Sequence, residues 1–495
     1  MNSTDASVFD FIIVGAGSAG CVMANKLSES GRFSVLLLEQ GKRDSSVLLT
    51  MPKGFGAVLA GTTYVSRYPV TRAANEPSSE VWLRGKTLGG SSAVNGMLWA
   101  RPQPEGFAAL SRAGGDAWAW SRMEPYFHAL DGSGSSDGII PTTTHVPQHA
   151  ITQAFIESSC ATGLPRHERM VDMGQRGVGY LHFNIDQKGK RRSASTAFLK
   201  PLHRRTNVRI ETDIQVDKLV FEGKRATSVV CHRKGGKISY TARREIVLCA
   251  GTLESPQILQ RSGVGPAPLL GELGIPVIHA NPRVGANLRE HLLAGISFGV
   301  KSWSDSENRQ YAGLPLIWNV LRYFMTGKGP MAQSPCHAAA FIRSDEVLNT
   351  PDIMLMFSPY SREGNGFSKS PGISIAGYLM YPKSSGDIRI RSSDPGVAAL
   401  IRPNYLSDEY DRQCCVAAVR HIRAIAAQPP LAAKLLRELP SSAAAQSDDE
   451  IIELYRNGGQ PGYHAAGTCA MGSDSASSVV DGNTRVHGID GVRVV

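Results

Sequence analysis

The start of the chain alternates short apolar runs with small and polar residues. Residues 11–14 and 34–38 are apolar runs of the length expected for buried β-strands. Residues 21–27, between these runs, carry apolar side chains at helical spacing. Two buried strands joined by a helix are typical of a parallel sheet with a crossover connection, so the pattern predicts an α/β unit here.

A glycine-rich turn connects the first strand to the helix, and an acidic residue ends the second strand. Gly15 permits a tight turn, Gly17 lets the backbone approach a pyrophosphate, and Gly20 lets the helix lie close to the strand. Glu39 is placed to accept hydrogen bonds from ribose hydroxyls, which disfavours a 2′-phosphate. This combination predicts a bound adenine dinucleotide rather than an ordinary glycine-rich turn. The predicted binding residues are Gly15, Ala16, Gly17, Ser18, Ala19, Gly20 and Glu39.

A second glycine-rich stretch covers residues 82–102 and carries no charge from Leu88 to Ala100. Its glycines allow close backbone approach, and its Met, Leu and Trp side chains supply apolar surface. This composition predicts a second wall for a large planar cofactor, with a glycine-rich linker as the alternative. The predicted wall residues are Gly89, Gly90, Ser91, Asn95, Gly96, Met97 and Leu98.

The middle of the chain contains further strand patterns separated by turn signals. Residues 246–249 form another buried run, followed by Ala250-Gly251 and a helical pattern over 255–261. Because this repeats the order of strand, small-residue turn and helix, we expect it to join the same parallel sheet. The shorter strand candidates are residues 208–214, 218–221, 226–232 and 238–242.

The character of the chain changes between about residues 300 and 440, which predicts a second domain that covers the cofactor. The expected antiparallel strands are residues 372–379 and 386–391, and the expected helices are residues 412–427 and 432–439. Ser447 and Glu450 have the spacing of a capping box, which predicts the start of a short helix. Residues 131–138 are rich in Gly, Ser and Asp and predict a surface loop.

Composition and charge exclude several classes of protein. The chain has 495 residues, of which 42% are hydrophobic and 19% charged, as in ordinary folded proteins with a large core. The net charge of +10 comes from small scattered basic groups without interleaved aromatic residues, which argues against nucleic-acid binding. The charge is either spread over the surface or gathered in a basic rim that steers anionic substrates or touches membrane lipid.

The eight cysteines show neither a disulfide framework nor a Cys/His pattern for zinc, so no metal site is predicted. Reduced thiols are typical of the cytoplasm. No apolar run reaches the length of a transmembrane helix, and the first residues lack the basic start of a signal peptide. We therefore expect a cytoplasmic protein and leave open a peripheral contact at the inner face of a membrane.

Several segments, in order along the chain, resemble those of the glucose–methanol–choline (GMC) oxidoreductases, a family of FAD-dependent enzymes. The resemblance runs from about Phe9 to the last residue and is nearest to the choline/alcohol-dehydrogenase-like branch. The matching segments are Gly15–Gly20 with Glu39, Gly85–Pro102, Ala250–Pro266, Val284–Leu292, Pro382–Gly386, Asn404–Leu406 and Tyr463–Gly472.

The resemblance implies an α/β fold (α+β overall) with two parts. One is an FAD-binding, Rossmann-like domain with a parallel sheet, and the other is a substrate-binding domain with an antiparallel sheet flanked by helices. Residues 1–299 are expected to be mostly FAD-binding domain and residues 300–455 the substrate-binding domain. Residues 456–495 return to the FAD domain with the catalytic histidine, and this last part is expected to be incomplete.

The resemblance also assigns roles to individual residues. It implies that Val216 lies by the adenine through its backbone, that residues 95–98 run beside the flavin, and that His464 is the active-site base. Residues 92–95 contain no histidine, so FAD is expected to be bound non-covalently. A structural role is the default for the other histidines, including His291. His337 lies in a segment that often lines the family's pocket, which leaves a substrate contact open as the alternative.

Alcohol oxidation needs a base for the hydroxyl proton and an acceptor for the hydride of the adjacent carbon. A neutral histidine suits the first task, and no side chain can perform the second. The resemblance therefore implies oxidation of a primary or secondary alcohol, with proton abstraction by His464 and hydride transfer to flavin N5. Oxygen, a quinone or another carrier would be the final acceptor. The alternatives are a redox-silent lyase similar to the family's hydroxynitrile lyases, or an inactive flavoprotein.

The end of the chain departs from the family pattern. In the family, the strand at residues 491–495 continues into an Asp-Ala segment at the flavin, an Asn or His partner of the catalytic histidine, and a final helix. The resemblance therefore implies that a C-terminal segment is missing here. Loss of that segment is expected to weaken flavin retention and activity.

Overall fold

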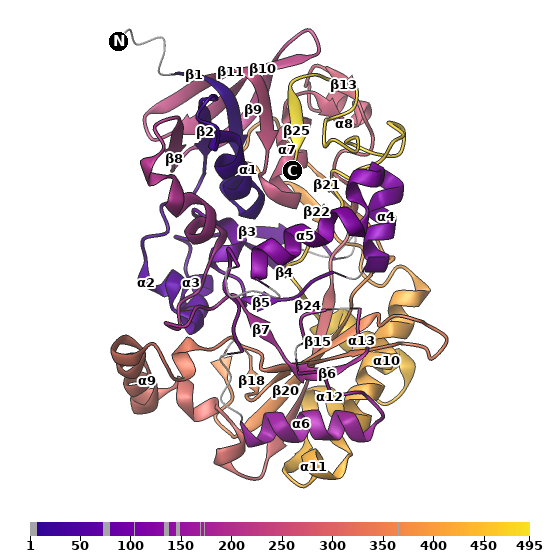
Figure 1. Ribbon diagram of the computed structural model, residues 1–495. Coiled ribbons are helices and arrows are strands. Elements are labelled where there is room, and N and C mark those ends of the chain that lie inside the picture. Colours follow the sequence, from indigo (N-terminus) through magenta and orange to yellow (C-terminus); the bar gives the residue numbers. More distant parts are fainter. Residues whose placement is uncertain are drawn as a thin grey trace.

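The computed structural model describes residues 7–72, 80–102, 104–132, 138–144, 149–168, 170–172, 174–364 and 366–495. Figure 1 shows a sheet with parallel strands in the upper half of the molecule and an antiparallel sheet in the lower half. Helices flank both sheets, which confirms the α/β class predicted from the sequence. Most of the loop expected at residues 131–138 lies outside the described residues.

The upper sheet has the strand order β8-β2-β1-β11-β10-β9, and β25 also pairs with β11. Its central pairs are parallel, with Ile12 opposite both Leu36 and Ile246. The paired segments at the centre of the sheet, residues 11–14, 35–38 and 246–248, are apolar throughout because structure covers both faces of the sheet there. The strands are β1 (Val8–Val14), β2 (Val35–Leu38), β8 (Val208–Glu211), β9 (Gln215–Glu222), β10 (Arg225–Arg233), β11 (Gly236–Leu248) and β25 (Val492–Val494). The two strands expected at 238–242 and 246–249 are thus parts of one strand, β11.

Helix α1 (Ser18–Ser28) follows β1 as predicted and packs closely on the turn before it. Gly15 has φ +97°, a left-handed conformation that glycine adopts without strain. A Cβ at Gly20 would lie 1.9 Å from the Gly15 carbonyl oxygen, so only glycine fits there. Helix α7 (Gly251–Arg261) repeats this arrangement after β11 and begins four residues earlier than expected.

The lower sheet has the order β23-β15-β20-β17-β16-β6, with β24 also paired to β15. All of its pairs are antiparallel. Helices α6 (Ala150–Ala161), α10 (Glu409–Ala426) and α13 (Asp448–Gly458) share its apolar core, in which the Phe155 and Phe357 rings stack 4.8 Å apart. The strands are β6 (Gly177–Tyr180), β15 (Leu292–Val300), β16 (Ala338–Ile342), β17 (Ile353–Ser358), β20 (Gly372–Leu379), β23 (Leu435–Glu438) and β24 (Gln460–Pro461).

The helix predicted over residues 432–439 is wrong. Helix α11 (Pro429–Ala432) ends where that helix was expected to begin, and residues 435–438 form β23. Phe298 of β15 pairs with Glu438, so an open sheet edge decides the structure in place of local helix propensity. The capping box is confirmed, because Ser447 and Glu450 exchange both expected hydrogen bonds at the start of α13.

Smaller elements join the two halves. The remaining helices are α2 (Val47–Thr50), α3 (Phe55–Ala60), α4 (Pro104–Gly114), α5 (Trp120–Asp131), α8 (Ala267–Glu272), α9 (Gly313–Thr326) and α12 (Pro440–Ala443). The remaining strands include β3 (Val65–Val70), β4 (Glu80–Gly85), β5 (Leu98–Trp99), β7 (His182–Phe183), β14 (Ala286–Leu288), β21 (Gly386–Arg389) and β22 (Leu400–Arg402). Within the described parts of the chain, no helix has the length and apolar character needed to cross a bilayer.

The fit of α1 against β1 can be tested by adding a single methyl group. We expect Gly20→Ala to lower the free energy of unfolding by about 1–3 kcal/mol, because the backbone must move away from the new Cβ. Gly56→Ala in α3 is the matched control: nothing lies within 4 Å of its new Cβ, so stability should be kept or slightly raised. Denaturant unfolding measures both variants, and equal stability of the two would contradict the close packing.

Candidate active site

Two segments far apart in the sequence meet between the sheets and bring two histidines together. Arg289 and Ala466 exchange backbone hydrogen bonds of 2.9 and 3.0 Å. Tyr463 has φ +61°, an uncommon conformation that turns the chain just before His464. A Cβ at Gly467 would lie 2.2 Å from the Asn287 carbonyl oxygen, so the two backbones are in close contact.

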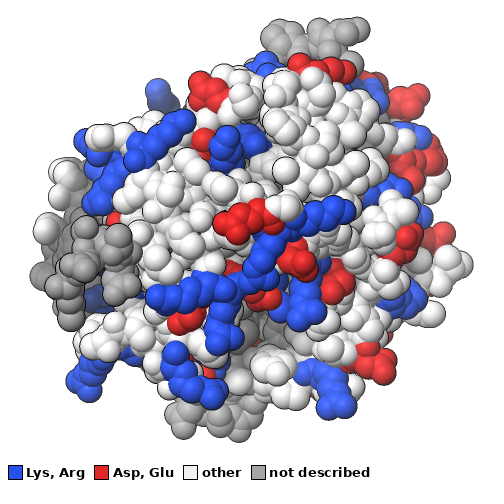
Figure 2. All heavy atoms as spheres, turned by 90° about the horizontal axis from the view of Figure 1, so that it is seen from above, with Lys and Arg blue, Asp and Glu red and all other residues white. Residues whose placement is uncertain are grey.

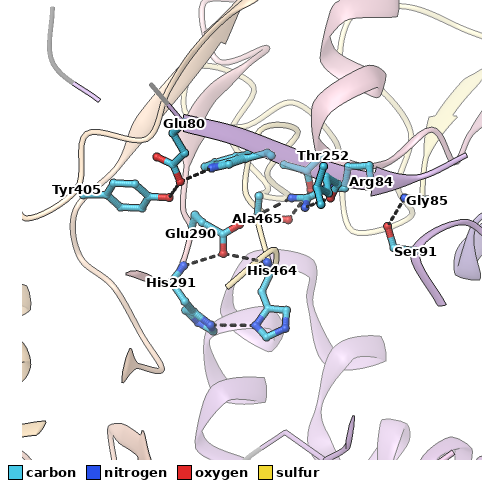
Figure 3. A network of polar contacts seen from close by, with 12 residues as sticks. Glu80, Arg84, Gly85, Ser91, Thr252, Glu290, His291, Tyr405, His464 and Ala465 are labelled. Atoms are coloured by element: carbon cyan, nitrogen blue, oxygen red, sulfur yellow. Dashed lines mark hydrogen bonds and ion pairs between the residues drawn. The ribbon is translucent and has the colours of Figure 1, made fainter. Parts of the chain in front are cut away.

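The buried carboxylate of Glu290 joins these segments. Its Oε1 accepts hydrogen bonds from the backbone N–H groups of His291 and His464, both at 2.8 Å (Figure 3). The guanidinium of Arg84, from β4, lies 3.7 Å from the other oxygen. Burial raises the pKa of Glu290 to about 7, against the lowering effect of the backbone donors and Arg84.

The two imidazole rings are hydrogen-bonded to each other through their Nδ1 atoms, 3.1 Å apart. Nε2 of His291 lies 3.0 Å from the carbonyl oxygen of Met380, which can only accept, so this nitrogen carries the proton. In the neutral ring, Nδ1 of His291 is then the acceptor, and Nδ1 of His464 must donate to it. Nε2 of His464 is therefore left without a proton and has a free lone pair.

Both rings are neutral near pH 7. Burial, reinforced by the neighbouring His464, lowers the pKa of His291 to about 4. Burial and the positive charge of Arg84 also lower the pKa of His464 below its ordinary value. The ring of Tyr378 stacks on His291 at 4.8 Å and fixes its plane. The protein atoms around His464 desolvate its ring, but the residue keeps part of its surface exposed, so the ring can be reached by a reactant.

The two glycine-rich stretches predicted to hold a cofactor are in direct contact. The N–H of Gly89 donates to the Ala16 carbonyl oxygen at 2.8 Å. A Cβ at Gly90 would lie 2.7 Å from the Cα of Gly17, so this approach also requires glycine. Helix α1 begins here with no side chain bonded to its first N–H groups and no acidic residue in its first turn, which suits a phosphate group.

Glu39 lies at the end of β2, as predicted, and is buried. Its carboxylate accepts the N–H groups of Ala16 at 2.9 Å and Gly41 at 2.8 Å, and burial raises its pKa to about 7. The N–H of Ile214 donates to the Glu39 carbonyl oxygen at 3.0 Å. This bond places Val216, at the start of β9, close to the carboxyl end of β2.

Asn95, on the opposite wall, is bound by an arginine that the sequence analysis did not identify. The guanidinium of Arg191 donates to the side-chain and backbone oxygens of Asn95, each at 2.7 Å. Arg191 is only 2% exposed, and burial lowers its pKa to about 9. Within the described part of the chain no carboxylate pairs with Arg191, and its Nε has no hydrogen-bond partner. A buried cation without a counter-ion fits a site for a cofactor that carries negative charge.

The other predicted wall residues lie on both sides of Asn95 in the chain. The Ser334 hydroxyl donates to the Gly96 carbonyl oxygen at 2.7 Å and joins the wall to the lower half. Met97 is buried with φ +65°, and Leu98 begins the short strand β5. The hydroxyl of Ser91 accepts a hydrogen bond from the N–H of Gly85 at 3.1 Å (Figure 3). This hydrogen bond joins two parts of the second glycine-rich stretch to each other.

A second polar cluster lies behind this wall, around the ammonium group of Lys53. The ammonium lies 4.7 and 5.0 Å from the ring centres of Tyr311 and Tyr360. Burial lowers the pKa of Lys53 to about 8, while Glu307 acts in the opposite direction. His337 is fully buried, with Nδ1 3.3 Å from the Thr152 hydroxyl and Nε2 3.7 Å from Glu307. This environment favours the structural role of His337 over a substrate contact.

A hollow of about 780 Å³ lies at the other end of the upper sheet, where β1 begins. Arginines and acids line it, and Arg244–Asp10 and Arg493–Glu245 form ion pairs of 3.7 and 2.7 Å. Figure 2 shows the molecule from above, where basic and acidic side chains are interleaved. The hollow lies away from the glycine-rich turns, and its mixed charge gives no reason to place the chemistry there.

Comparison with known proteins identifies the family of the chain. Two family models for GMC oxidoreductases match residues 9–293 and 382–495. The chain is 35% identical to oxygen-dependent choline dehydrogenases of Yersinia pseudotuberculosis and Pseudomonas aeruginosa, over 98% of this chain and 88–89% of theirs. The crystal structure of pyridoxine 4-oxidase from "Mesorbium loti" matches 98% of this chain and 93% of that chain, with a TM-score of 0.86 and 30% identity. A formate oxidase structure matches 99% of this chain and 93% of that chain, with a TM-score of 0.89 and 22% identity, which supports the fold alone. The chain therefore belongs to the GMC oxidoreductases and is an FAD-dependent enzyme that oxidises alcohol-type donors.

Proposed function

We propose that the chain oxidises a primary or secondary alcohol and that Nε2 of His464 accepts the hydroxyl proton. The hydrogen-bond chain from His464 through His291 to the Met380 carbonyl supports this proposal, because it leaves a lone pair on Nε2 of a residue that is partly exposed. FAD, when bound, supplies the hydride acceptor at N5. The lyase alternative has less support, because the relatives described above are named for oxidations.

The environment of His464 favours transfer of a proton onto the ring and its later release. The ring is available to take the proton because its lowered pKa keeps it unprotonated near pH 7. Once protonated, the ring is destabilised by burial and by the positive charge of Arg84, so it does not retain the proton. Glu290 does not neutralise the imidazolium directly, because its Oε1 is bonded to the backbone of His464 and not to the ring.

We also propose that FAD is held non-covalently. Arg191, the uncapped end of α1 and the Gly89–Gly90 wall provide charge and close backbone contact without a nucleophile. Cys21 and Cys249 lie near the first glycine turn, but burial raises the pKa of each thiol to about 12. Neither thiol would be a thiolate at neutral pH, so neither could form a bond to the flavin readily.

The substrate we propose is a small alcohol, and oxygen is the acceptor we favour. Two of the relatives are named for choline and for pyridoxine, and both of these compounds carry an alcohol group. The names of the same two relatives, an oxygen-dependent dehydrogenase and an oxidase, favour oxygen as the acceptor. The cytoplasmic location and the domain boundaries near residues 299 and 455 stay predictions.

Removal of the base should slow reduction of the flavin. We expect His464→Ala to reduce the anaerobic rate of flavin bleaching by an alcohol by about 10²–10⁴-fold, the range for loss of a general base. The panel should include choline, aromatic hydroxymethyl compounds and short aliphatic alcohols. His203→Ala, at an exposed site in a separate part of the surface, is the matched control and should keep the wild-type rate. An unchanged rate in His464→Ala would contradict the assignment, and a flavin that no alcohol bleaches would contradict the proposed function.

The pH dependence should report the neutral state of His464. We expect kcat/KM to fall on the acid side through a pKa below the ordinary value of histidine, because only the unprotonated ring can accept the proton. His291→Ala should lower kcat, because His464 loses the acceptor for its Nδ1–H. His291→Asn should recover part of that loss, since its amide oxygen can accept the same hydrogen bond. Equal kcat in wild type and His291→Ala would show that the ring pair does not position the base.

The mode of FAD binding can be tested on the denatured protein. We expect all flavin to pass an ultrafiltration membrane after acid or heat denaturation, because no covalent bond is proposed. The wild-type chain filtered without denaturation is the control and should retain its flavin. Yellow colour that stays with the precipitated chain would contradict non-covalent binding.

A further inference from the structure

Helix α9 (Gly313–Thr326) turns its apolar face away from the protein. Six large apolar side chains have between 51% and 80% of their surface exposed: Leu314, Ile317, Trp318, Leu321, Phe324 and Met325. Their spacing of three and four residues places them on one face of the helix. Single exposed apolar residues are ordinary, but a continuous apolar face of this kind marks an interaction site.

The opposite face of α9 is held firmly by the protein. Tyr323 is buried with Met51 and Met331, and its hydroxyl donates to the Gly189 carbonyl oxygen at 3.2 Å. The side chain of Asn319 is buried and donates to the Gln310 carbonyl oxygen at 3.0 Å. Figure 1 shows α9 at the lower left edge of the molecule, with no other element outside it. The apolar face is therefore presented outward by a docked helix.

The exposed charged side chains of the segment around α9 are all basic. Within residues 301–334, all four basic residues are exposed: Lys301, Arg309, Arg322 and Lys328. The two acidic residues of this segment, Asp305 and Glu307, are buried and bonded to Lys434 and Tyr311. Lys188 and Lys190 are also exposed, in the turn that contacts Gly327. The apolar face is thus bordered by basic side chains without exposed acids from the same segment.

We propose that α9 inserts its apolar face into the interfacial region of an anionic lipid bilayer, as a peripheral contact. An apolar helix face with Trp and Phe, bordered by Lys and Arg, has the composition of helices that lie in the plane of a bilayer. The basic side chains would contact anionic headgroups while the apolar ones enter the acyl boundary. A second copy of the chain fits less well, because a symmetric contact would bring Arg309, Arg322 and Lys328 close to the same residues of the partner.

The test measures the fraction of the full, FAD-loaded chain that sediments with lipid vesicles. We expect binding to vesicles that contain phosphatidylcholine and phosphatidylglycerol, and weaker binding to phosphatidylcholine alone. Leu321→Glu should lower the bound fraction at least about tenfold, because a charge on the inserted face must be desolvated. Val347→Glu changes another exposed apolar residue, between β16 and β17, and should bind like the wild type. Added salt should weaken binding by screening the headgroup contacts.

Both substitutions are at exposed positions, so the melting temperature and flavin content of the variants should match the wild type. Three results would overturn the proposal. The first is no binding to vesicles of either composition. The second is equal binding of Leu321→Glu and wild type, or equal loss in Val347→Glu. The third is a dimer that Leu321→Glu dissociates in the absence of vesicle binding, which would assign the face to a second copy of the chain.

Discussion

The candidate active site depends on one buried carboxylate between two segments that the chain brings together from a distance. Glu290 holds the N–H groups of His291 and His464 on a single oxygen, so the two histidine backbones cannot separate without breaking a hydrogen bond to a buried carboxylate. Such a loss costs about 1–3 kcal/mol in proteins. Arg84 stands near the second oxygen and balances the charge. The carboxylate therefore acts on backbone position, and the hydrogen bonds between the rings follow from that position.

The cofactor side of the molecule depends on close backbone contact and on an uncompensated charge. Gly20 packs on Gly15, and Gly90 packs on Gly17, so both glycine-rich stretches use the missing Cβ to bring main chain against main chain. Arg191 adds a cation that is buried without an acidic partner in the described structure. Burial of an unpaired charge is costly, and an anionic cofactor would offset that cost. The stability of this wall and the binding of FAD are thereby coupled.

Much of the fold and part of the site could be predicted from the sequence, because the signals are local. The first glycine turn, its helix and Glu39 lie within one short stretch, and their spacing is sufficient to predict their contacts. The strand β23 could not be predicted, since its helical pattern is overridden by a sheet edge that forms more than a hundred residues earlier in the chain. Arg191 and the pairing of His291 with His464 were missed for the same reason: each depends on a contact between distant segments. The sequence shows the residue types in these cases but not their neighbours.

The hydrogen bonds that run from His464 to His291 end at a backbone carbonyl oxygen, that of Met380, and this acceptor has a chemical consequence. A carboxylate in the place of the Met380 oxygen would favour the charged ring and raise the pKa of the pair. The carbonyl fixes the tautomer of His291, and through it the tautomer of His464, without adding negative charge. Burial and Arg84 then keep the pKa of His464 below its ordinary value. Orientation and basicity are thus set by separate groups, which allows a ring that is firmly oriented and still unprotonated near pH 7.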